Sequence, residues 1–343
     1  MRRAPVRSGS AVAVALLLAS MTALAGSTAR AATASGHCGR ACLDGMVDDY
    51  IAALVAHDPS RVPIAPDARF VQNTVPMKPG EGLWKTASAG PTSFKIYVPD
   101  PVAQQVGFLG VMQEDGKPIE LALRLKIRHG KIVEMEHLIA RNLRPASLKN
   151  LETPRPAFLQ TVPRAERSSR AKMLMIGASY YQALVTGNGR AAPFAADCVR
   201  HENGMQTTSN TRPAETPIGN TGGSSAMAKL GSLGCEAQID THTFDYITRI
   251  EPRRVWIADP VTGLVFGLSQ FRQPMRQKFV KIVGVPGVDR IPMNFKPFDL
   301  PAAHIFKVSD GKIHQIEAMG FVMPYDSKTG WERPAHAAAV PHS

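Results

Sequence analysis

Hydrophobic and polar positions follow the same order twice along the chain. Residues 43–56 and residues 171–185 carry apolar side chains at helical spacing. Alternating stretches typical of strands come after each, and in the first half these are residues 94–98, 106–113, 121–128 and 132–140. The pattern predicts an α+β fold in which N-terminal helices cover one face of a curved antiparallel sheet.

Several short segments recur in register in the two halves. DARFVQN at 67–73 corresponds to DCVRHEN at 197–203, IYVPDP at 96–101 to VWIADP at 255–260, and HGKI at 129–132 to DGKI at 310–313. Because their order is the same in both halves, the chain contains two tandem copies of one domain. We expect copy one over residues 37–142 and copy two over residues 171–331.

Three stretches stand outside the repeat. Residues 143–170 are rich in proline and are expected to link the copies. Copy two has two insertions, residues 207–232 and residues 273–298. Residues 332–343 are expected to form a flexible tail.

The N-terminus has the composition of an export signal. Three arginines stand among the first seven residues, an uncharged apolar run covers 11–26, and Ala29-Arg30-Ala31 has the small-x-small cleavage pattern. The run is shorter than the roughly 20 residues that span a bilayer, although an uncleaved anchor is the alternative. We therefore expect residues 1–31 to be a signal peptide and the protein to be exported, to the periplasm or the cell exterior.

The four cysteines agree with export. Four cysteines allow three pairings, and spacing along the chain favours the disulfides Cys38–Cys42 and Cys198–Cys235. Disulfides persist in oxidising compartments. Zinc is the alternative for thiolates, but no second Cys or His pair stands at ligand spacing, so we expect no metal.

The formal charge is +12, and four of the basic residues lie in the signal segment, which leaves +8 for the rest. These basic residues are dispersed, without a basic arm or an aromatic-interleaved basic stretch, so we expect no nucleic-acid partner and no stable membrane insertion. Attraction to an anionic cell surface stays open.

The element order and several motifs resemble the nuclear transport factor 2-like superfamily, which includes the SnoaL-like polyketide cyclases. The motifs are CGRACL at 38–43, LVAHDP at 54–59, GEGLW at 80–84 and RHENG at 200–204. More closely, the chain resembles a family of exported proteins with two such domains. The resemblance implies two cone-shaped domains, each with a pocket beneath its first helix. It also implies cofactor-independent isomerase, dehydratase, cyclase or lyase chemistry, or binding without catalysis.

Copy two has titratable residues where copy one is apolar or neutral. Alignment of the closing hairpins places His304 at the position of Leu123, on the apolar face. Alignment of the DARFVQN segment places His201 and Glu202 at an apolar and a neutral position. Together with His242, these residues are candidates for acid–base catalysis. The alternatives are hydrogen-bonded core histidines, or a metal site that no residue spacing supports.

Four further residues of copy two are candidates for substrate binding: Tyr181, Asn203, Arg254 and Trp256. Tyr181 belongs to the helix expected over the pocket, where aromatic residues also serve as core. Glu202-Asn203 is also a sequence that caps turns through its side chains. Arginine is suited to an anionic group, although solvation at the surface is its more common role.

The sequence contains no Gly-rich phosphate loop, His-Glu-x-x-His or nucleophile elbow, so we expect no cofactor. The first hypothesis is a cofactor-independent lyase, isomerase or dehydratase that acts on a small, largely apolar or aromatic molecule in the pocket of copy two. The second is a non-catalytic exported protein that binds a hydrophobic ligand or a protein partner. Either would be a monomer whose two copies imitate a dimer, or a homodimer.

Overall fold

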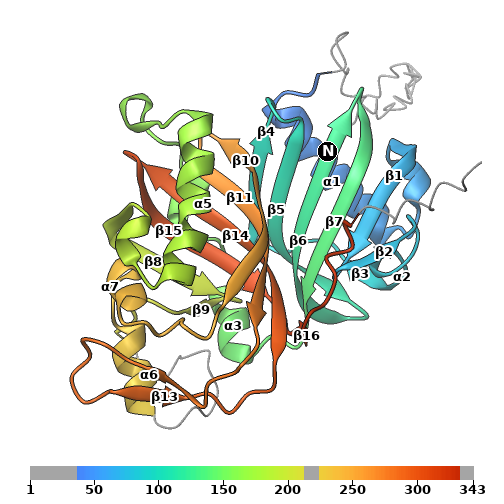
Figure 1. Cartoon of the computed structure of the whole chain (residues 1–343). Coiled ribbons are helices and arrows are strands. Elements are labelled where there is room, and N and C mark those ends of the chain that lie inside the picture. The colour runs from blue at the N-terminus through green and yellow to red at the C-terminus, as the bar shows by residue number, and fades with distance from the viewer. Residues whose placement is uncertain (1–36, 212–223, 333–343) are drawn as a thin grey trace, which may run out of the picture. The chain divides into compact units, whose positions relative to one another are not determined.

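A computed structural model of the chain describes residues 37–211 and 224–332 (Figure 1). The expected signal peptide, residues 1–31, lies outside the described residues. So do residues 212–223 of the first insertion and residues 333–343 of the expected tail.

Copy one consists of one long helix and a seven-stranded sheet. The helix α1, Arg40–Val55, buries the apolar face that its spacing predicts. Two short helical turns follow, η1 (Pro59–Arg61) and α2 (Leu83–Thr86). The strands are β1 (Ile64–Gln72), β2 (Val75–Met77), β3 (Ala87–Ala89), β4 (Lys95–Asp100), β5 (Gln105–Glu114), β6 (Lys117–Arg128) and β7 (Lys131–Ala140).

The strand order is β2-β1-β7-β6-β5-β3, and β4 also pairs with β5. Neighbours are antiparallel except β1 and β7, which run parallel. A parallel pair needs a long crossover connection, and the chain from β2 to β6 supplies it. The sequence predicts the antiparallel strands. The structure adds β1, the strand that follows the first helix, as the parallel partner of β7.

Copy two repeats this arrangement. The helix α5 (Arg170–Thr186) precedes η3 (Gly189–Ala191), and the sheet order is β10-β11-β14-β15-β8-β9, with β16 on β14. The strands are β8 (Phe194–Glu202), β9 (Met205–Gln206), β10 (Arg249–Asp259), β11 (Leu264–Gln273), β14 (Phe298–Ser309), β15 (Lys312–Gly320) and β16 (Met323–Pro324). Here β15 and β8 are the parallel pair. The predicted α+β class, with two curled and mainly antiparallel sheets, is confirmed.

The remaining elements lie in the connector and the insertions. The connector forms α3 (Pro145–Asn150), α4 (Pro156–Leu159) and η2 (Arg164–Glu166). The first insertion ends in α6 (Ser224–Gly231), and α7 (Cys235–Asp240) follows it. The second insertion forms a separate hairpin of β12 (Phe279–Lys281) and β13 (Arg290–Pro292).

Each sheet uses both faces. One face packs against the long helix of its own copy. The other faces of the two sheets share one core, to which Leu109 and Ile96 contribute from copy one and Phe266 and Ile305 from copy two. At Gly107 the approach is so close that a Cβ atom would lie 2.4 Å from the ring of Phe266.

Two ion pairs join the copies reciprocally. Arg40, at the start of α1, binds Asp259 of copy two at 2.5 Å. Arg170, at the start of α5, binds Asp100 of copy one at 2.7 Å. Such reciprocity is the mark of an isologous contact, in which the same surface of each partner meets its counterpart. The two copies therefore contact each other in the way that the subunits of a two-fold symmetric dimer do.

Candidate functional site

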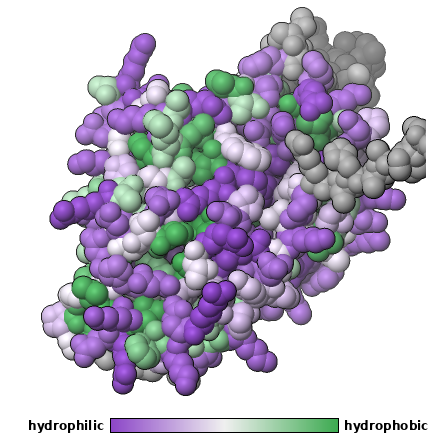
Figure 2. All heavy atoms as spheres, viewed as in Figure 1, coloured by the Kyte–Doolittle hydropathy of each residue, from purple (hydrophilic) through white to green (hydrophobic). Residues whose placement is uncertain are grey.

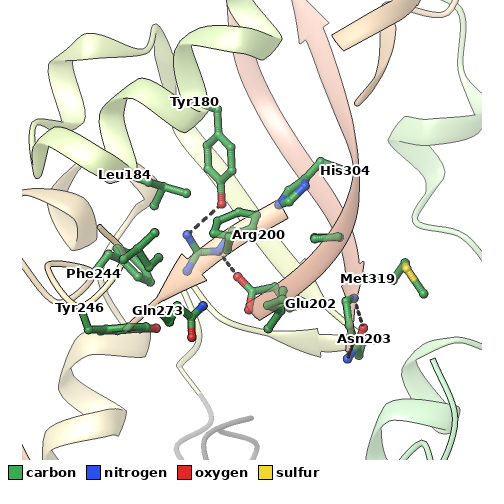
Figure 3. A pocket seen from close by; sticks show the side chains of 16 residues that line it. Tyr180, Leu184, Arg200, Glu202, Asn203, Phe244, Tyr246, Gln273, His304 and Met319 are labelled. Atoms are coloured by element: carbon green, nitrogen blue, oxygen red, sulfur yellow. Dashed lines mark hydrogen bonds and ion pairs between the residues drawn. The ribbon is translucent and has the colours of Figure 1, made fainter. Parts of the chain in front are cut away.

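A pocket of about 120 Å³ lies between α5 and the inner face of the copy-two sheet (Figure 3). Aliphatic and aromatic side chains form much of its wall. Its polar residues are Tyr180, Arg200, Glu202, Asn203, Tyr246, Gln273 and His304. An apolar cavity of about 150 Å³ is enough to hold benzene. The pocket is slightly smaller than that, so its size suits a short branched molecule.

One row across the sheet brings two of the candidate residues to this pocket. Glu202 on β8 lies opposite Ala318 on β15, and Ala318 lies opposite His304 on β14. Residues directly opposite share a face, and strands are about 4.8 Å apart, so the backbones of Glu202 and His304 lie about 10 Å apart. Because Ala318 between them is small, the space between the two side chains stays open.

His304 is buried among aromatic rings. Its Nδ1 lies 3.3 Å from the hydroxyl of Tyr181, and it stacks on Phe306 and Phe271. Burial, together with the charge of Arg200, lowers the pKa of His304 to about 3. The imidazole is therefore neutral at neutral pH. Within the described part of the chain, its Nε2 has no hydrogen-bond partner.

A histidine of copy one indicates which nitrogen of His304 carries the proton. The Nε2 of His137 lies 2.9 Å from the Tyr50 hydroxyl, and its Nδ1 lies 3.4 Å from Oε1 of Gln72. That oxygen also accepts from the Leu83 N–H, so His137 donates through Nδ1 and accepts from Tyr50. If tyrosine is likewise the donor in copy two, Nδ1 of His304 accepts and its Nε2–H points at the cavity.

Arg200 is a buried charge that the sequence comparison did not single out. Its guanidinium donates to Thr207 Oγ1 at 2.9 Å and Gln238 Oε1 at 2.6 Å, and it lies 3.0 Å from the carboxylate of Glu202. The DARFVQN alignment pairs Arg200 with Phe70, whose ring packs on His137 in copy one. The same comparison that pointed to Glu202 therefore contained this signal.

Glu202 stands at the more open side of the pocket, where its side chain is 44% exposed. Its contact with Arg200 orients the carboxylate beside the cavity (Figure 3). In copy one the same position holds Gln72. The pocket therefore contains one buried cation, one carboxylate at its edge and one neutral imidazole.

The other two proposed catalytic histidines lie elsewhere. His201 pairs with Glu317 on the opposite face of the sheet, where burial and the charge of Arg155 lower its pKa to about 3. Successive strand residues face opposite sides, so Glu202 and His201 cannot both line the pocket. His242 follows α7, and its half-exposed side chain lies 3.3 Å from Asp245.

Two of the proposed substrate-binding residues lie at or behind the pocket. Tyr181 stands behind His304, whose Nδ1 it contacts. Asn203 lines the pocket, but its amide is occupied by Gly320, donating to the carbonyl at 2.9 Å and accepting from the N–H at 2.8 Å. Asn73 bonds Ile139 in the same way in copy one. Asn203 therefore holds the sheet together.

Arg254 and Trp256 lie at the boundary between the copies, away from the pocket. Arg254 binds both carboxylate oxygens of Glu136 at 2.5 Å. Trp256 is 43% exposed, with its ring 5.8 Å from the Arg254 guanidinium. These two residues join copy two to copy one.

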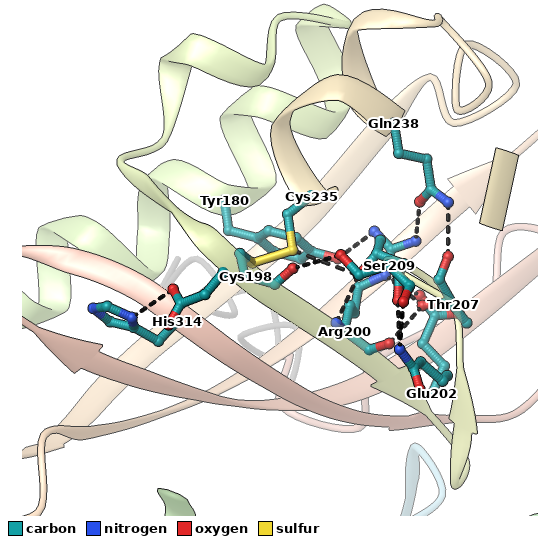
Figure 4. Close-up of a disulfide and its surroundings, with 12 residues drawn as sticks. Tyr180, Cys198, Arg200, Glu202, Thr207, Ser209, Cys235, Gln238 and His314 are labelled. Atoms are coloured by element: carbon teal, nitrogen blue, oxygen red, sulfur yellow. Dashed lines mark hydrogen bonds and ion pairs between the residues drawn. A yellow bond between two sulfur atoms is a disulfide. The ribbon is translucent and has the colours of Figure 1, made fainter. Parts of the chain in front are cut away.

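Both expected disulfides form, and one of them supports the pocket. Cys38 pairs with Cys42. Cys198 on β8 pairs with Cys235 at the start of α7, three residues before Gln238, which holds Arg200 (Figure 4). The disulfides agree with an oxidising, exported environment.

No helix in residues 37–211 and 224–332 is long and apolar enough to cross a membrane. The same residues contain no group of three or more His, Cys, Asp or Glu side chains placed to hold a metal ion.

A family model described as a domain of unknown function, DUF8021, matches residues 166–320, which cover the end of the connector and most of copy two. No curated protein matches the chain.

Three solved structures show a loose likeness. A de novo designed protein with a curved β-sheet has 15% identity and a TM-score of 0.24, over 33% of this chain and 96% of its own. AclR, a proposed hydroxylase of Streptomyces galilaeus, has 17% identity and a TM-score of 0.25, over 37% and 92%. A proposed polyketide cyclase of Silicibacter sp. TM1040 has 13% identity and a TM-score of 0.27, over 44% and 89%. Scores this low say nothing about activity.

Proposed function

We propose that copy two is a cofactor-independent acid–base enzyme, a lyase, isomerase or dehydratase for a small, largely apolar molecule. The observation that carries the proposal is the row on which Glu202 and His304 flank one cavity across Ala318. The motifs that resemble the nuclear transport factor 2-like superfamily support the same chemistry. We also propose that residues 1–31 direct export and that the domains occupy residues 37–142 and 171–331.

The two side chains have different roles, Glu202 as a proton acceptor and His304 as a hydrogen-bond donor. Among the described residues that line the cavity, Glu202 is the only carboxylate. It takes a proton from a carbon next to a carbonyl group. His304 is neutral, since burial holds its pKa near 3. It therefore serves as a donor through Nε2–H to the carbonyl oxygen, where negative charge develops. A neutral imidazole can polarise a carbonyl in this way.

The first test is whether the protein exchanges substrate protons with solvent. Small molecules that co-purify with the exported chain are identified by mass spectrometry and incubated with fresh protein in D₂O. Wild type should introduce deuterium or form a product, while Glu202→Gln and His304→Asn should each slow this at least 100-fold. Glu114→Gln, in copy one, is the matched control and should keep full activity.

The second candidate is a carrier for an apolar ligand. It is favoured by the contact between Glu202 and Arg200, because a carboxylate held by an arginine is a weaker proton acceptor. A carrier would return its ligand unchanged and free of deuterium. In that case Glu202→Gln and His304→Asn would alter only the amount of ligand that co-purifies.

A further inference from the structure

The second insertion of copy two builds a hairpin that the domain itself does not need. In copy one, β5 and β6 are joined by the turn Asp115-Gly116, whereas β11 and β14 of copy two are separated by β12 and β13. Val280 and Ile291 form the inner side of the hairpin and pack in a small core with Leu230 of α6. The hairpin therefore has a stable position of its own, and its outer side is exposed in the part of the chain that the structure describes.

That outer side is strongly basic. Lys281 lies opposite Arg290 on the two strands. The exposed basic residues of the insertion are Arg276, Lys278, Lys281, Arg290 and Lys296. Among the residues that the structure describes, none of the five has an ion-pair partner. The insertion has one acidic residue, Asp289, so its formal net charge is 5 − 1 = +4.

The insertion also exposes large apolar side chains, close to these charges along the chain. Phe279 is 49% exposed, Val283 46% and Phe295 42%, and the Arg290 guanidinium lies 5.4 Å from the Phe279 ring. Green apolar and purple polar side chains alternate over the β13 and α6 region at the lower left of Figure 2. Single exposed apolar residues are common on soluble proteins. Aromatic rings within a cluster of unpaired basic residues are typical of surfaces that bind at a lipid interface.

The hairpin rises from the edge of the pocket. Gln273 is the last residue of β11 and the first of the insertion, and Leu300 lies on β14 just after the insertion. Both line the pocket. A surface bound by the hairpin would therefore lie close to the pocket entrance, which suits the exchange of an apolar molecule.

We propose that the β12–β13 hairpin docks copy two onto an anionic phospholipid bilayer. The basic side chains contact the lipid headgroups, and Phe279 and Phe295 enter the interface without spanning it. Binding is reversible and sensitive to salt, because headgroup attraction is screened within a Debye length. The proposal goes beyond the activity of the pocket and holds whether copy two is an enzyme or a carrier.

The test is cosedimentation of the purified mature chain with vesicles of phosphatidylcholine containing 30% phosphatidylserine, and with vesicles of phosphatidylcholine alone. Wild type should bind only the anionic vesicles and should dissociate in 0.5 M NaCl. Each basic residue near the surface contributes about fivefold in affinity. The variant Lys281→Gln/Arg290→Gln should therefore bind about 25-fold more weakly, while the control Lys95→Gln/Lys117→Gln, which removes two exposed charges of copy one, should bind like wild type.

A second variant separates lipid from other polyanions. Phe279→Ser/Phe295→Ser keeps every charge, so it should lose most vesicle binding but still bind a heparin column like wild type. The proposal would be overturned if Lys281→Gln/Arg290→Gln and Lys95→Gln/Lys117→Gln lost vesicle binding equally. It would also be overturned if the wild type bound neutral and anionic vesicles equally. Full vesicle binding by the phenylalanine variant would instead indicate a soluble polyanion. Vesicle binding needs no substrate, so its failure is distinct from failure of the proposed function.

Discussion

His137 and His304 belong to equivalent cross-strand pairs of the two copies, but each stands on the other strand of its pair. In copy one, His137 on β7 faces Leu123 on β6. In copy two, His304 on β14 faces Ala318 on β15. Both imidazoles contact a tyrosine of the long helix, at 2.9 Å and 3.3 Å. Copy one fills the pair with two large side chains, whereas copy two pairs its histidine with a methyl group and lines a pocket there.

Filling that space should remove ligand binding without harming the fold. Ala318→Leu adds three carbon atoms to the wall of a cavity of about 120 Å³. Each buried CH₂ stabilises by about 0.8 kcal/mol before strain is subtracted. We expect an unchanged or slightly raised Tm and no co-purifying small molecule.

Ala303, which lies on the other face of the copy-two sheet, is the matched control. Ala303 is buried in the core that the two sheets share, so a larger side chain there would meet packed neighbours. Ala303→Leu should therefore destabilise by about 1–3 kcal/mol through overpacking, while ligand still co-purifies. If Ala318→Leu destabilises as much as Ala303→Leu, the pocket is not open in solution.

Several features of the fold follow from patterns along the chain. The repeat, the order of helix and strands and both disulfides could be predicted because they depend on local spacing and on matched motifs. The side chains facing the pocket were harder to predict. His201 and Glu202 are adjacent on β8, and alternation allows only one of them to face inward.

The sheet faces that meet the other copy could not be identified from the sequence. Strands packed on both sides read as continuous apolar runs, and β11 is buried almost throughout. Nothing in such a run says which face meets the other copy. Arg254 and Trp256 lie on the neighbouring strand β10. Arg254 binds Glu136 of copy one instead of facing the pocket, and the Trp256 ring lies beside Arg254.

The contact between the copies should depend strongly on Glu136. This buried carboxylate binds Arg254 through both oxygens and lies 3.3 Å from Arg124. Glu136→Gln would leave the largely buried guanidinium of Arg254 without a carboxylate, whereas Arg124 would keep Glu134 at 2.8 Å. Breaking a buried pair in this way costs about 3–5 kcal/mol. Urea unfolding at pH 7 measures the change.

Glu114 provides the comparison for Glu136. It pairs with Arg141, whose side chain is 40% exposed, so Glu114→Gln should cost less than about 1 kcal/mol. Similar losses in the two variants would mean that water reaches Glu136 in solution and that the core between the sheets is loosely packed.

The two disulfides should differ in their effect on stability. The Cys198–Cys235 bond closes a loop of 37 residues and the Cys38–Cys42 bond one of 4. Loop entropy then gives about 4 and about 2 kcal/mol. Replacing each pair by serine and measuring urea unfolding tests the order. Because the first bond positions α7 and its Gln238, its loss should also weaken ligand binding, while loss of the second should not.

Glu120 should make the stability of the protein decline as pH rises. It is fully buried in the sheet-to-sheet region, and neither carboxylate oxygen has a hydrogen-bond partner within the described residues. Burial raises its pKa from 4.5 to about 8, opposed by the charge of Arg155. The folded protein thus keeps a proton that the unfolded chain has already released. The stability associated with Glu120 is complete below pH 4.5 and is lost as pH rises to 8, by up to about 1.4 kcal/mol per pH unit.

Glu120→Gln removes this titration and keeps the shape of the side chain. The variant should therefore gain stability relative to wild type across pH 5–8, and the difference should level off above pH 8. Urea unfolding of both proteins at each pH unit from 5 to 9 measures it. The subtraction cancels the buried histidines, whose lowered pKa values change stability in the opposite direction below pH 6.5. A difference that stays constant over the whole range would show that Glu120 is ionised in the folded protein, with Arg155 compensating its charge.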